Sequence, residues 1–267
     1  MNLIVPIKQV PETSEVKMDE STGTMIREGV ECTVNPLDLY AIEAALRLRE
    51  VHGGKATAIS MGPMKALEAL REAIAMGCDD AILLSDSSFA GSDTWATSLV
   101  LSRAILRLGI PHLIICGERA TDGDTAQVGP GIASFLDLPV STYTSHIEID
   151  ALRGEARVRR MVEEGYEVWR LPLPALVTVV KEIAEPRLPT LKGKRRAKRM
   201  EIPIWGLEEL GLEKGETGLA GSPTRVVKIF RPTISRQGKV FTARDESHVD
   251  EACEALVKFL EERGLLG

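Results

Sequence analysis

The sequence predicts an α/β fold built around a parallel β-sheet, and three observations support this class. The 267 residues are 44% hydrophobic, which is enough apolar material to bury a substantial core. Aromatic residues make up only 4%, whereas Ala, Leu, Ile and Val are plentiful, a composition that suits helices and buried parallel strands. Short apolar runs also alternate with helical patterns at the spacing of parallel βαβ units.

Four short apolar runs, each bounded by glycine, proline or charge, predict buried strands at residues 3–7, 56–61, 81–84 and 113–116. The segments between them have helical periodicity and predict helices at residues 37–51, 64–76 and 93–108. The apolar spacing of the first helix places four side chains toward the core: Leu39, Ile42, Leu46 and Val51.

Proline and glycine mark the ends of these helices. Pro36 fits the first turn of the first helix, with Asn35 as its cap. The three helices end at glycines, namely Gly53 with Gly54, Gly77 and Gly109.

The remaining segments predict hairpins, a linker and a C-terminal arm. Residues 15–29 predict a β-hairpin on the edge of the sheet, and residues 143–149 and 157–162 predict a second hairpin, followed by a strand at 175–180. After Lys181 a basic loop at 186–200 leads into a linker-like stretch, and residues 246–263 form one amphipathic helix. We therefore expect a nucleotide-binding α/β domain at 1–230 and a C-terminal arm at 231–267.

Charge and cysteine content exclude several classes of function. With 33 Lys and Arg against 39 Asp and Glu, the chain has a net charge of −6, so we expect no nucleic-acid partner. The four cysteines lie far apart without a metal-ligand spacing, which predicts reduced thiols and no metal. We see no signal peptide and no run of eighteen apolar residues, so we expect a cytoplasmic protein with no direct membrane insertion.

The richest candidate site is the segment 117–131, which follows a predicted strand and runs into a helix ending near Leu136. Its glycines allow close backbone approach, Asp122 or Asp124 can cap the helix, and free N–H groups of the first turn can bind a phosphate. Judged by spacing alone, an ordinary capped βα turn explains this segment as well as a phosphate site does, because neither a dinucleotide-binding nor a P-loop glycine motif is present. Two further loops, Pro6-Ile7-Lys8 and Ser60-Met61-Gly62, point into the same crevice of a parallel sheet and, with Asn35, could hold an adenosine.

Side chains for acyl or phosphoryl transfer are missing. The four histidines have no Ser or Cys partner in a nucleophile motif, so structural or surface roles are favoured and no catalytic residue is assigned.

A basic run gives this acidic chain a local positive feature. It holds seven cations and no acid, with Leu188 and Leu191 interspersed: Arg187, Lys192, Lys194, Arg195, Arg196, Lys198 and Arg199. A solvated strip, a nucleic-acid contact and a docking loop for an acidic partner are the alternatives. The lack of aromatic residues for base stacking weakens the second.

Seven motifs in this order resemble the β subunit of an electron transfer flavoprotein. They are VPIKQV, VNPLDLYAIEAALRL, SMGP, AMGCD, the loop at 122–130, LPALVT and EPRLPTL, and together they span most of the chain. The resemblance implies a three-layer α/β/α sandwich akin to the adenine nucleotide α-hydrolase group and a heterodimer with an α subunit that carries FAD. It also implies that this chain binds AMP or a second FAD whose AMP portion occupies the same crevice.

Carried over by position, the resemblance implies an adenosine site and a phosphate site that agree with the loops above. The adenosine would be lined by Pro6, Ile7, Lys8, Asn35, Ser60 and Met61. The phosphates would be surrounded by Gly123, Asp124, Thr125, Gln127, Val128 and Gly129, and the remaining cofactor-binding residues of the segment would be Gly117, Asp122, Ala126 and Pro130.

The phosphate loop resembles the electron-bifurcating branch of the family. In that branch a flavin in the β subunit accepts a hydride from NADH and sends one electron to a high-potential acceptor and the other to ferredoxin or flavodoxin. Gly123, standing where the AMP-binding branch has an acid, lessens negative charge beside a pyrophosphate, and Pro130 suits the start of a helix.

The resemblance also implies docking partners. The basic run falls at the family's recognition loop, with Leu191 as the apolar anchor for an acyl-CoA dehydrogenase or quinone oxidoreductase, and the C-terminal helix would pack on the α subunit. A regulatory Glu of the mitochondrial type aligns with Met161 and is not carried over. Alternatives are a simple AMP-containing electron carrier, a non-redox nucleotide sensor of the universal-stress type, and an ATP-using ligase or hydrolase, whose Ser-Gly-Gly-x-Asp-Ser signature is missing.

Overall fold

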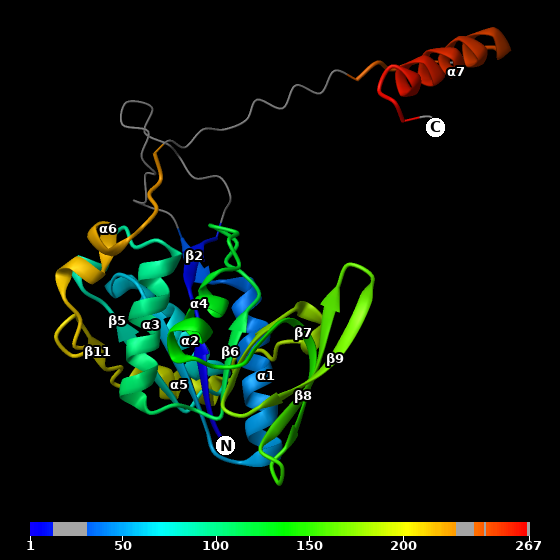
Figure 1. Ribbon diagram of the computed structural model, residues 1–267. Coiled ribbons are helices and arrows are strands. Elements are labelled where there is room, and N and C mark those ends of the chain that lie inside the picture. The colour runs from blue at the N-terminus through cyan, green and yellow to red at the C-terminus, as the bar shows by residue number, and fades with distance from the viewer. Residues whose placement is uncertain (13–30, 228–237, 243, 266–267) are drawn as a thin grey trace. The chain divides into compact units, whose positions relative to one another are not determined.

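The computed structural model describes residues 1–12, 31–227, 238–242 and 244–265 (Figure 1). The chain divides into two units, Met1–Lys228 and Ile229–Gly267. The second unit contributes one long helix, α7 (Glu246–Glu261), whose first turn is capped by Asp245. The predicted C-terminal helix is therefore present, ending two residues earlier than expected.

The first unit is organised around a nine-stranded sheet of order β11-β5-β4-β1-β6-β10-β7-β8-β9. Its parallel strands are β1 (Asn2–Pro6), β4 (Lys55–Met61), β5 (Asp80–Leu84), β6 (Leu113–Gly117), β7 (Val140–Asp150), β10 (Ala175–Val179) and β11 (Ile204–Trp205). Strands β1, β4, β5, β6 and β10 coincide with the predicted apolar runs within two residues at each end. They lie in the interior of the sheet, where an apolar run can be buried on both faces.

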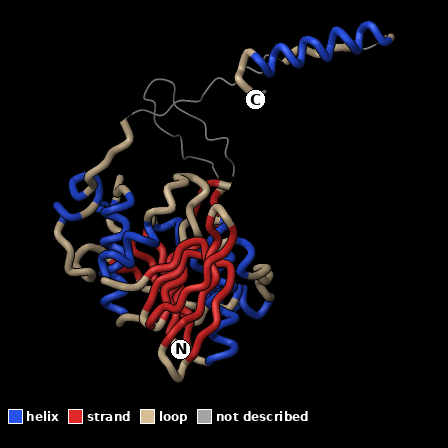
Figure 2. Tube along the Cα trace, turned by 45° about the vertical axis from the view of Figure 1, so that its right-hand side comes forward, coloured by secondary structure: helices blue, strands red, loops and turns tan. Residues whose placement is uncertain are grey.

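Helices cover both faces of the sheet, which gives the three layers that Figure 2 shows with the strands between the helices. The core of one face joins the sheet to α1 (Pro36–His52) and α2 (Leu67–Met76). The core of the other face joins it to α3 (Thr94–Leu108) and α4 (Val128–Leu136). The predicted three-layer α/β/α fold is confirmed.

The first three long helices end at the glycines that the sequence predicts. Gly53, Gly77 and Gly109 occupy the C-caps of α1, α2 and α3, and all three have positive φ, where glycine avoids the strain of a β-carbon. A 3₁₀ turn, η1 (Met64–Ala66), precedes α2. The prediction that Val51 faces the core was wrong, because its side chain is 76% exposed in the last turn of α1.

An antiparallel extension completes one edge of the sheet. The predicted second hairpin is present as β7 and β8 (Glu155–Val162), and a third strand that we did not predict, β9 (Gly165–Pro172), pairs with β8. The predicted first hairpin at 15–29 lies outside the described residues. On either side of that segment in the sequence, β2 (Gln9–Pro11) and β3 (Cys32–Val34) pair antiparallel in a separate two-stranded sheet and do not extend the main one.

The segment after β10 also differs from the prediction. The turn η3 (Lys181–Ile183) follows β10, and the expected basic loop contains a helix, α5 (Leu191–Arg199), which is capped by the Thr190 hydroxyl and packs against α2. The expected linker contains the edge strand β11, the turn η4 (Lys214–Glu216) and the short helix α6 (Gly218–Gly221). Within the part of the chain that the structure describes, no helix is both long and apolar enough to span a bilayer.

Candidate functional site

The carboxyl ends of β4, β1 and β6 lie side by side in the sheet and carry the three predicted loops. After β1 the chain continues into the strands on one side of it, and β6 follows on the other side, so the strand order reverses between β1 and β6. In open α/β sheets, ligands bind in the crevice at such a reversal. The topology therefore brings the predicted loops together at a typical ligand-binding position.

Asn35 links two of these loops. It occupies the N-cap position of α1 as predicted, but its side chain does not cap the helix. Instead, its Nδ2 donates to the carbonyl oxygen of Arg119 at 2.9 Å and its Oδ1 accepts from the N–H of Thr121 at 3.1 Å. Because Asn35 is 1% exposed, these bonds are shielded from water and fix the loop after β6 against the start of α1.

The glycines of the phosphate loop have different roles. A β-carbon at Gly117 would lie 2.4 Å from Oδ1 of Asp38, and one at Gly129 would lie 2.7 Å from Cγ2 of Thr178. These two glycines are therefore required by packing between strand, helix and loop. Gly123 has nothing within 4 Å of such a carbon, so the loop leaves space beside it.

The acids of this loop do not cap α4. The N-cap of that helix is Gln127, which makes no side-chain capping bond, so the prediction that Asp122 or Asp124 caps it was wrong. Asp122 instead pairs with Nζ of Lys8 at 2.7 Å, and Asp124 pairs with Nε of Arg119 at 3.1 Å.

The backbone of the loop has an unusual conformation for residues with side chains. Asp124 and Ala126 have φ values of 52° and 55°, whereas Gln127 is right-handed helical. A left-handed residue next to a right-handed one, as at Ala126 and Gln127, can turn successive N–H groups toward one side and form an anion-binding concavity. Thr125, Val128 and Pro130 complete this segment, and the side-chain oxygen of Gln127 accepts from the Thr94 hydroxyl at 2.8 Å.

The adenosine side of the site contains an unpartnered polar atom. Ser60, at the end of β4, is fully buried, and its Oγ has no hydrogen-bond partner. The neighbouring β1 end is fixed by the N–H of Ile7, which donates to the carbonyl of Ile59 at 2.8 Å, and Pro6 is buried while Met61 is partly buried. A buried hydroxyl without a partner is unfavourable, so Ser60 is suited to a ligand group that completes its bonding.

Asp38 is a functional candidate that sequence reasoning missed. Its side chain is buried below the loops, and Oδ2 accepts from the N–H of Lys8 at 2.7 Å. Burial raises the pKa of Asp38 to about 7, although the hydrogen bonds from Lys8 and Asn35 oppose that rise. Only the NPLD motif could have drawn attention to it, because an acid in the first turn of a helix is ordinarily a solvated one.

The predicted docking residue lies away from these loops, on α5. Leu191 is 80% exposed and Leu188 is 86% exposed. A hollow of about 490 Å³ is lined by residues of α5 and its C-cap, namely Lys192, Arg195, Arg196, Arg199 and Met200. The combination offers apolar anchors next to a cluster of positive charge.

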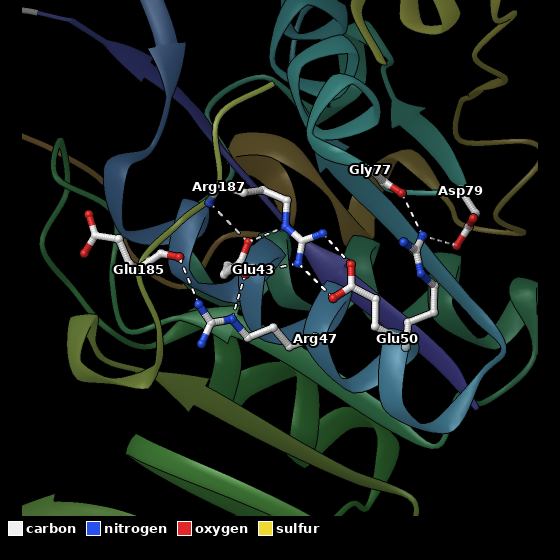
Figure 3. A network of polar contacts seen from close by, with 8 residues as sticks. Glu43, Arg47, Glu50, Gly77, Asp79, Glu185 and Arg187 are labelled. Atoms are coloured by element: carbon white, nitrogen blue, oxygen red, sulfur yellow. Dashed lines mark hydrogen bonds and ion pairs between the residues drawn. The ribbon is translucent and has the colours of Figure 1, made fainter. Parts of the chain in front are cut away.

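An ionic network centred on the buried Glu43, also not predicted, holds the segment that leads to α5 (Figure 3). The side chain of Glu43 is 3% exposed and accepts from Nε of Arg187 at 2.7 Å and from Nε of Arg47 at 2.7 Å. Arg187 also pairs with Glu50. Burial alone would raise the pKa of Glu43, but the hydrogen bonds from both arginines lower it overall. We call Glu43, Arg47, Glu50 and Arg187 the α1 network.

No group of three or more potential ligating side chains that could hold a metal ion occurs among the described residues. The Nδ1 atom of His112 accepts from the N–H of Asn2 at 3.0 Å, which agrees with the structural role expected for it. Cys78 and Cys116 are buried, and burial raises the pKa of both thiols, so neither is a reactive thiolate.

Comparison with known proteins finds relatives along the whole chain. Residues 22–210 match the model of the electron transfer flavoprotein domain. An electron transfer flavoprotein subunit beta from Thermoanaerobacterium thermosaccharolyticum is 46% identical over 267 residues, which cover 100% of each chain. Subunit CarD of the caffeyl-CoA reductase-Etf complex from Acetobacterium woodii is 44% identical over 267 residues, again with 100% of each chain covered. Protein FixA from Sinorhizobium fredii is 42% identical, with 96% of this chain and 92% of the relative covered.

The family model covers residues 22–210, which begin after β1 and its loop, and the first two relatives align with the whole chain. The chain therefore belongs to the electron transfer flavoprotein family, among its beta subunits.

Proposed function

We propose that this chain binds the adenine-nucleotide part of FAD at the carboxyl ends of β1, β4 and β6 and carries electrons as one half of a cytoplasmic heterodimer with an α subunit. The observation that carries the proposal is the convergence of three loops at one strand-order reversal, next to the unpartnered Ser60 hydroxyl and the open space at Gly123. AMP is the alternative occupant, because the two ligands share the adenosine and the first phosphate.

The residues present fit such a group. Ser60 Oγ can bond a ribose or adenine atom, since it has no other partner. The side chains of Lys8 and Arg119 are about half exposed, Lys8 pairing with Asp122 and Arg119 with Asp124 and Glu118, so both cations can turn toward phosphate oxygens. Backbone N–H groups near Ala126 add donors that carry no side-chain charge.

We further propose that the bound cofactor takes part in electron bifurcation. When bound, FAD would supply the hydride and electron chemistry, with NADH as donor and a ferredoxin or flavodoxin and a high-potential acceptor as receivers. Gly123 supports this, because an uncharged residue without nearby atoms leaves room for a second phosphate. The chain's own task is binding and orientation, which is consistent with the lack of a nucleophile motif.

The α7 helix and Leu191 are the proposed contacts with protein partners. The apolar side chains of α7 follow helical spacing and would pack on the flavin domain of the α subunit: Val249, Ala252, Cys253, Leu256, Phe259 and Leu260. Leu191 would enter a pocket of an acyl-CoA dehydrogenase or quinone oxidoreductase.

The substitution Gly123→Glu tests the nucleotide site. A glutamate fits the open space but adds negative charge where phosphate would bind, so the heterodimer should lose the nucleotide of this subunit and keep the FAD of the α subunit. Gly215→Glu is the control, because that glycine also has nothing within 4 Å and lies in η4. Unchanged nucleotide content in Gly123→Glu, measured by acid release and chromatography, would overturn the assignment.

A coupled assay tests bifurcation separately. NADH should reduce ferredoxin only while a high-potential acceptor is also being reduced. Oxidation of NADH that never requires the second acceptor, or no reaction with NADH, would instead indicate a simple AMP-containing carrier.

A further inference from the structure

Asp38 lies where the parts of the nucleotide site meet, although it belongs to none of the predicted loops. Its carboxylate accepts from the Lys8 N–H at 2.7 Å, while the Lys8 carbonyl accepts from the N–H of Asn35 at 2.8 Å. The backbone of Lys8 is therefore held on both sides by the first turn of α1. The β6 end is also tight against Asp38, because a β-carbon at Gly117 would lie 2.4 Å from its Oδ1.

This arrangement determines where the Lys8 ammonium can reach. With its backbone fixed, Lys8 extends its side chain to Asp122 in the phosphate loop at 2.7 Å. Asn35 fixes the same loop through Arg119 and Thr121. A change at Asp38 would thus move Lys8 relative to the loop that it faces.

The charge of Asp38 also acts on this site. The charged groups that influence it are Lys8 after β1 and Asp122 in the phosphate loop, and Asp38 in turn raises the pKa of the Cys116 thiol of β6. The turn η3, which packs on α1, contributes Lys181 and Glu182, and these act on Glu118. Two acids, Asp38 and Asp122, therefore share one cation, Lys8, and ionisation of the buried acid adds negative charge beneath the place proposed for phosphate.

We propose that Asp38 is a positioning residue of the nucleotide site, whose carboxyl group holds the Lys8 turn against β6 and whose ionisation weakens the binding of a nucleotide phosphate. The inference rests on the proposed function and deepens it. Because burial raises the pKa of Asp38 into the neutral range, the change in charge falls between pH 6 and pH 8. Rising pH deprotonates Asp38, so affinity for a phosphate should fall as the pH rises.

The test measures binding of AMP and of adenosine to the nucleotide-freed heterodimer by calorimetry at pH 6 and pH 8. The AMP dissociation constant at pH 8 divided by that at pH 6 should be about tenfold larger in the wild type than in Asp38→Asn, whose side chain does not ionise. Ionisation of the AMP phosphate itself affects both proteins equally and cancels in this comparison. Adenosine, which has no phosphate, should show the same ratio in both proteins. Glu50→Gln, an exposed acid of the same helix, should keep the wild-type ratio.

A second measurement needs no variant. At pH 7.5, AMP binding to the wild type should take up a fraction of a proton, seen as a dependence of the binding enthalpy on the buffer, while adenosine binding should not. Equal pH ratios in wild type and Asp38→Asn, or no proton uptake by the wild type, would overturn the role of Asp38. Failure of the wild-type heterodimer to bind either AMP or FAD would instead overturn the proposed function.

Discussion

The α1 network and the Lys8–Asp122 pair are both made of oppositely charged side chains, yet they differ in burial and in how fully they are bonded. Glu43 is 3% exposed and accepts from two arginines, which in turn bond Glu50 and the carbonyl of Glu185. The Lys8 and Asp122 side chains are 48% and 31% exposed and make one contact. In the first arrangement both oxygens of the buried Glu43 carboxylate are engaged, whereas the single exposed contact of the second can open.

The difference distinguishes charged groups that stabilise the fold from charged groups that can exchange their partner for a ligand. A buried carboxylate that loses its partner is left uncompensated, so the α1 network cannot exchange its partners cheaply. An exposed ion pair contributes little stability and is screened by water and salt, so Lys8 can leave Asp122 for a phosphate. The same reasoning predicts that variants in the α1 network alter stability, and that variants of the Lys8–Asp122 pair alter ligand binding.

The largest expected effect is that of Glu43→Gln. The change removes a buried charge while Arg187 and Arg47 keep theirs, and it should lower the free energy of unfolding by about 3 kcal/mol. Because the pKa of Glu43 is lowered in the folded state, its contribution is present above pH 4.5 and is lost as the pH falls below that value. The difference in thermal stability between wild type and variant should therefore be smaller at pH 4 than at pH 7. Glu50→Gln, at an exposed position, should cost less than about 1 kcal/mol, and an equal loss in both variants would contradict the distinction.

Gly193→Ala should have the next largest effect. A β-carbon there would lie 2.0 Å from the carbonyl oxygen of Ala75, so α5 would have to move away from α2. Such overpacking costs about 2 kcal/mol, and the amides of α5 should exchange hydrogen faster. Gly215→Ala adds a β-carbon in open space and should change neither the free energy of unfolding nor the exchange rates of the α5 amides. If the α5 amides of Gly193→Ala exchange hydrogen at the wild-type rate, the close approach of α5 to α2 is not required.

Lys8→Met should weaken AMP binding about tenfold, because it removes a cation from the proposed phosphate site. The melting temperature should shift by no more than about 2 °C, since the pair with Asp122 is exposed. Lys55→Met is the matched control, because Lys55 also pairs with an acid, Asp80, on the surface and is 53% exposed. If the Lys8 variant loses stability but keeps its affinity, the comparison between the two regions is wrong.

Leu191→Ala should have the smallest effect and only on docking. We expect KM for an acyl-CoA dehydrogenase partner to rise about fivefold at unchanged flavin content, because one exposed apolar anchor is lost. Leu152→Ala, at a fully exposed position in the turn after β7, is the control. Unchanged transfer kinetics at limiting partner concentration would remove Leu191 from the docking surface.

The predictable parts of this fold were those with local signals. The apolar runs of β1, β4, β5, β6 and β10 and the glycine caps of α1, α2 and α3 require no knowledge of distant residues. The loops of the site were predictable for a related reason, because parallel strands place their carboxyl ends at one edge.

The parts that escaped prediction depend on partners far away in the sequence. Asp38 and Glu43 look like solvated acids of a helix, yet they are buried because Lys8 and Arg187 reach them from other segments. Helix α5 has too many charges for an apolar stripe, and it is held by close packing of Gly193 on α2. Strand β9 is mostly exposed and therefore lacks the apolar run of a buried strand.

The most direct test of the central claim is to count cofactors in the heterodimer after co-expression with the α subunit. Acid release and chromatography should give two FAD and no AMP per heterodimer if this chain binds FAD at the β1–β4–β6 edge. One FAD with one AMP would keep the nucleotide site but contradict bifurcation. A single FAD with no AMP would mean that this chain binds no nucleotide and would contradict the account.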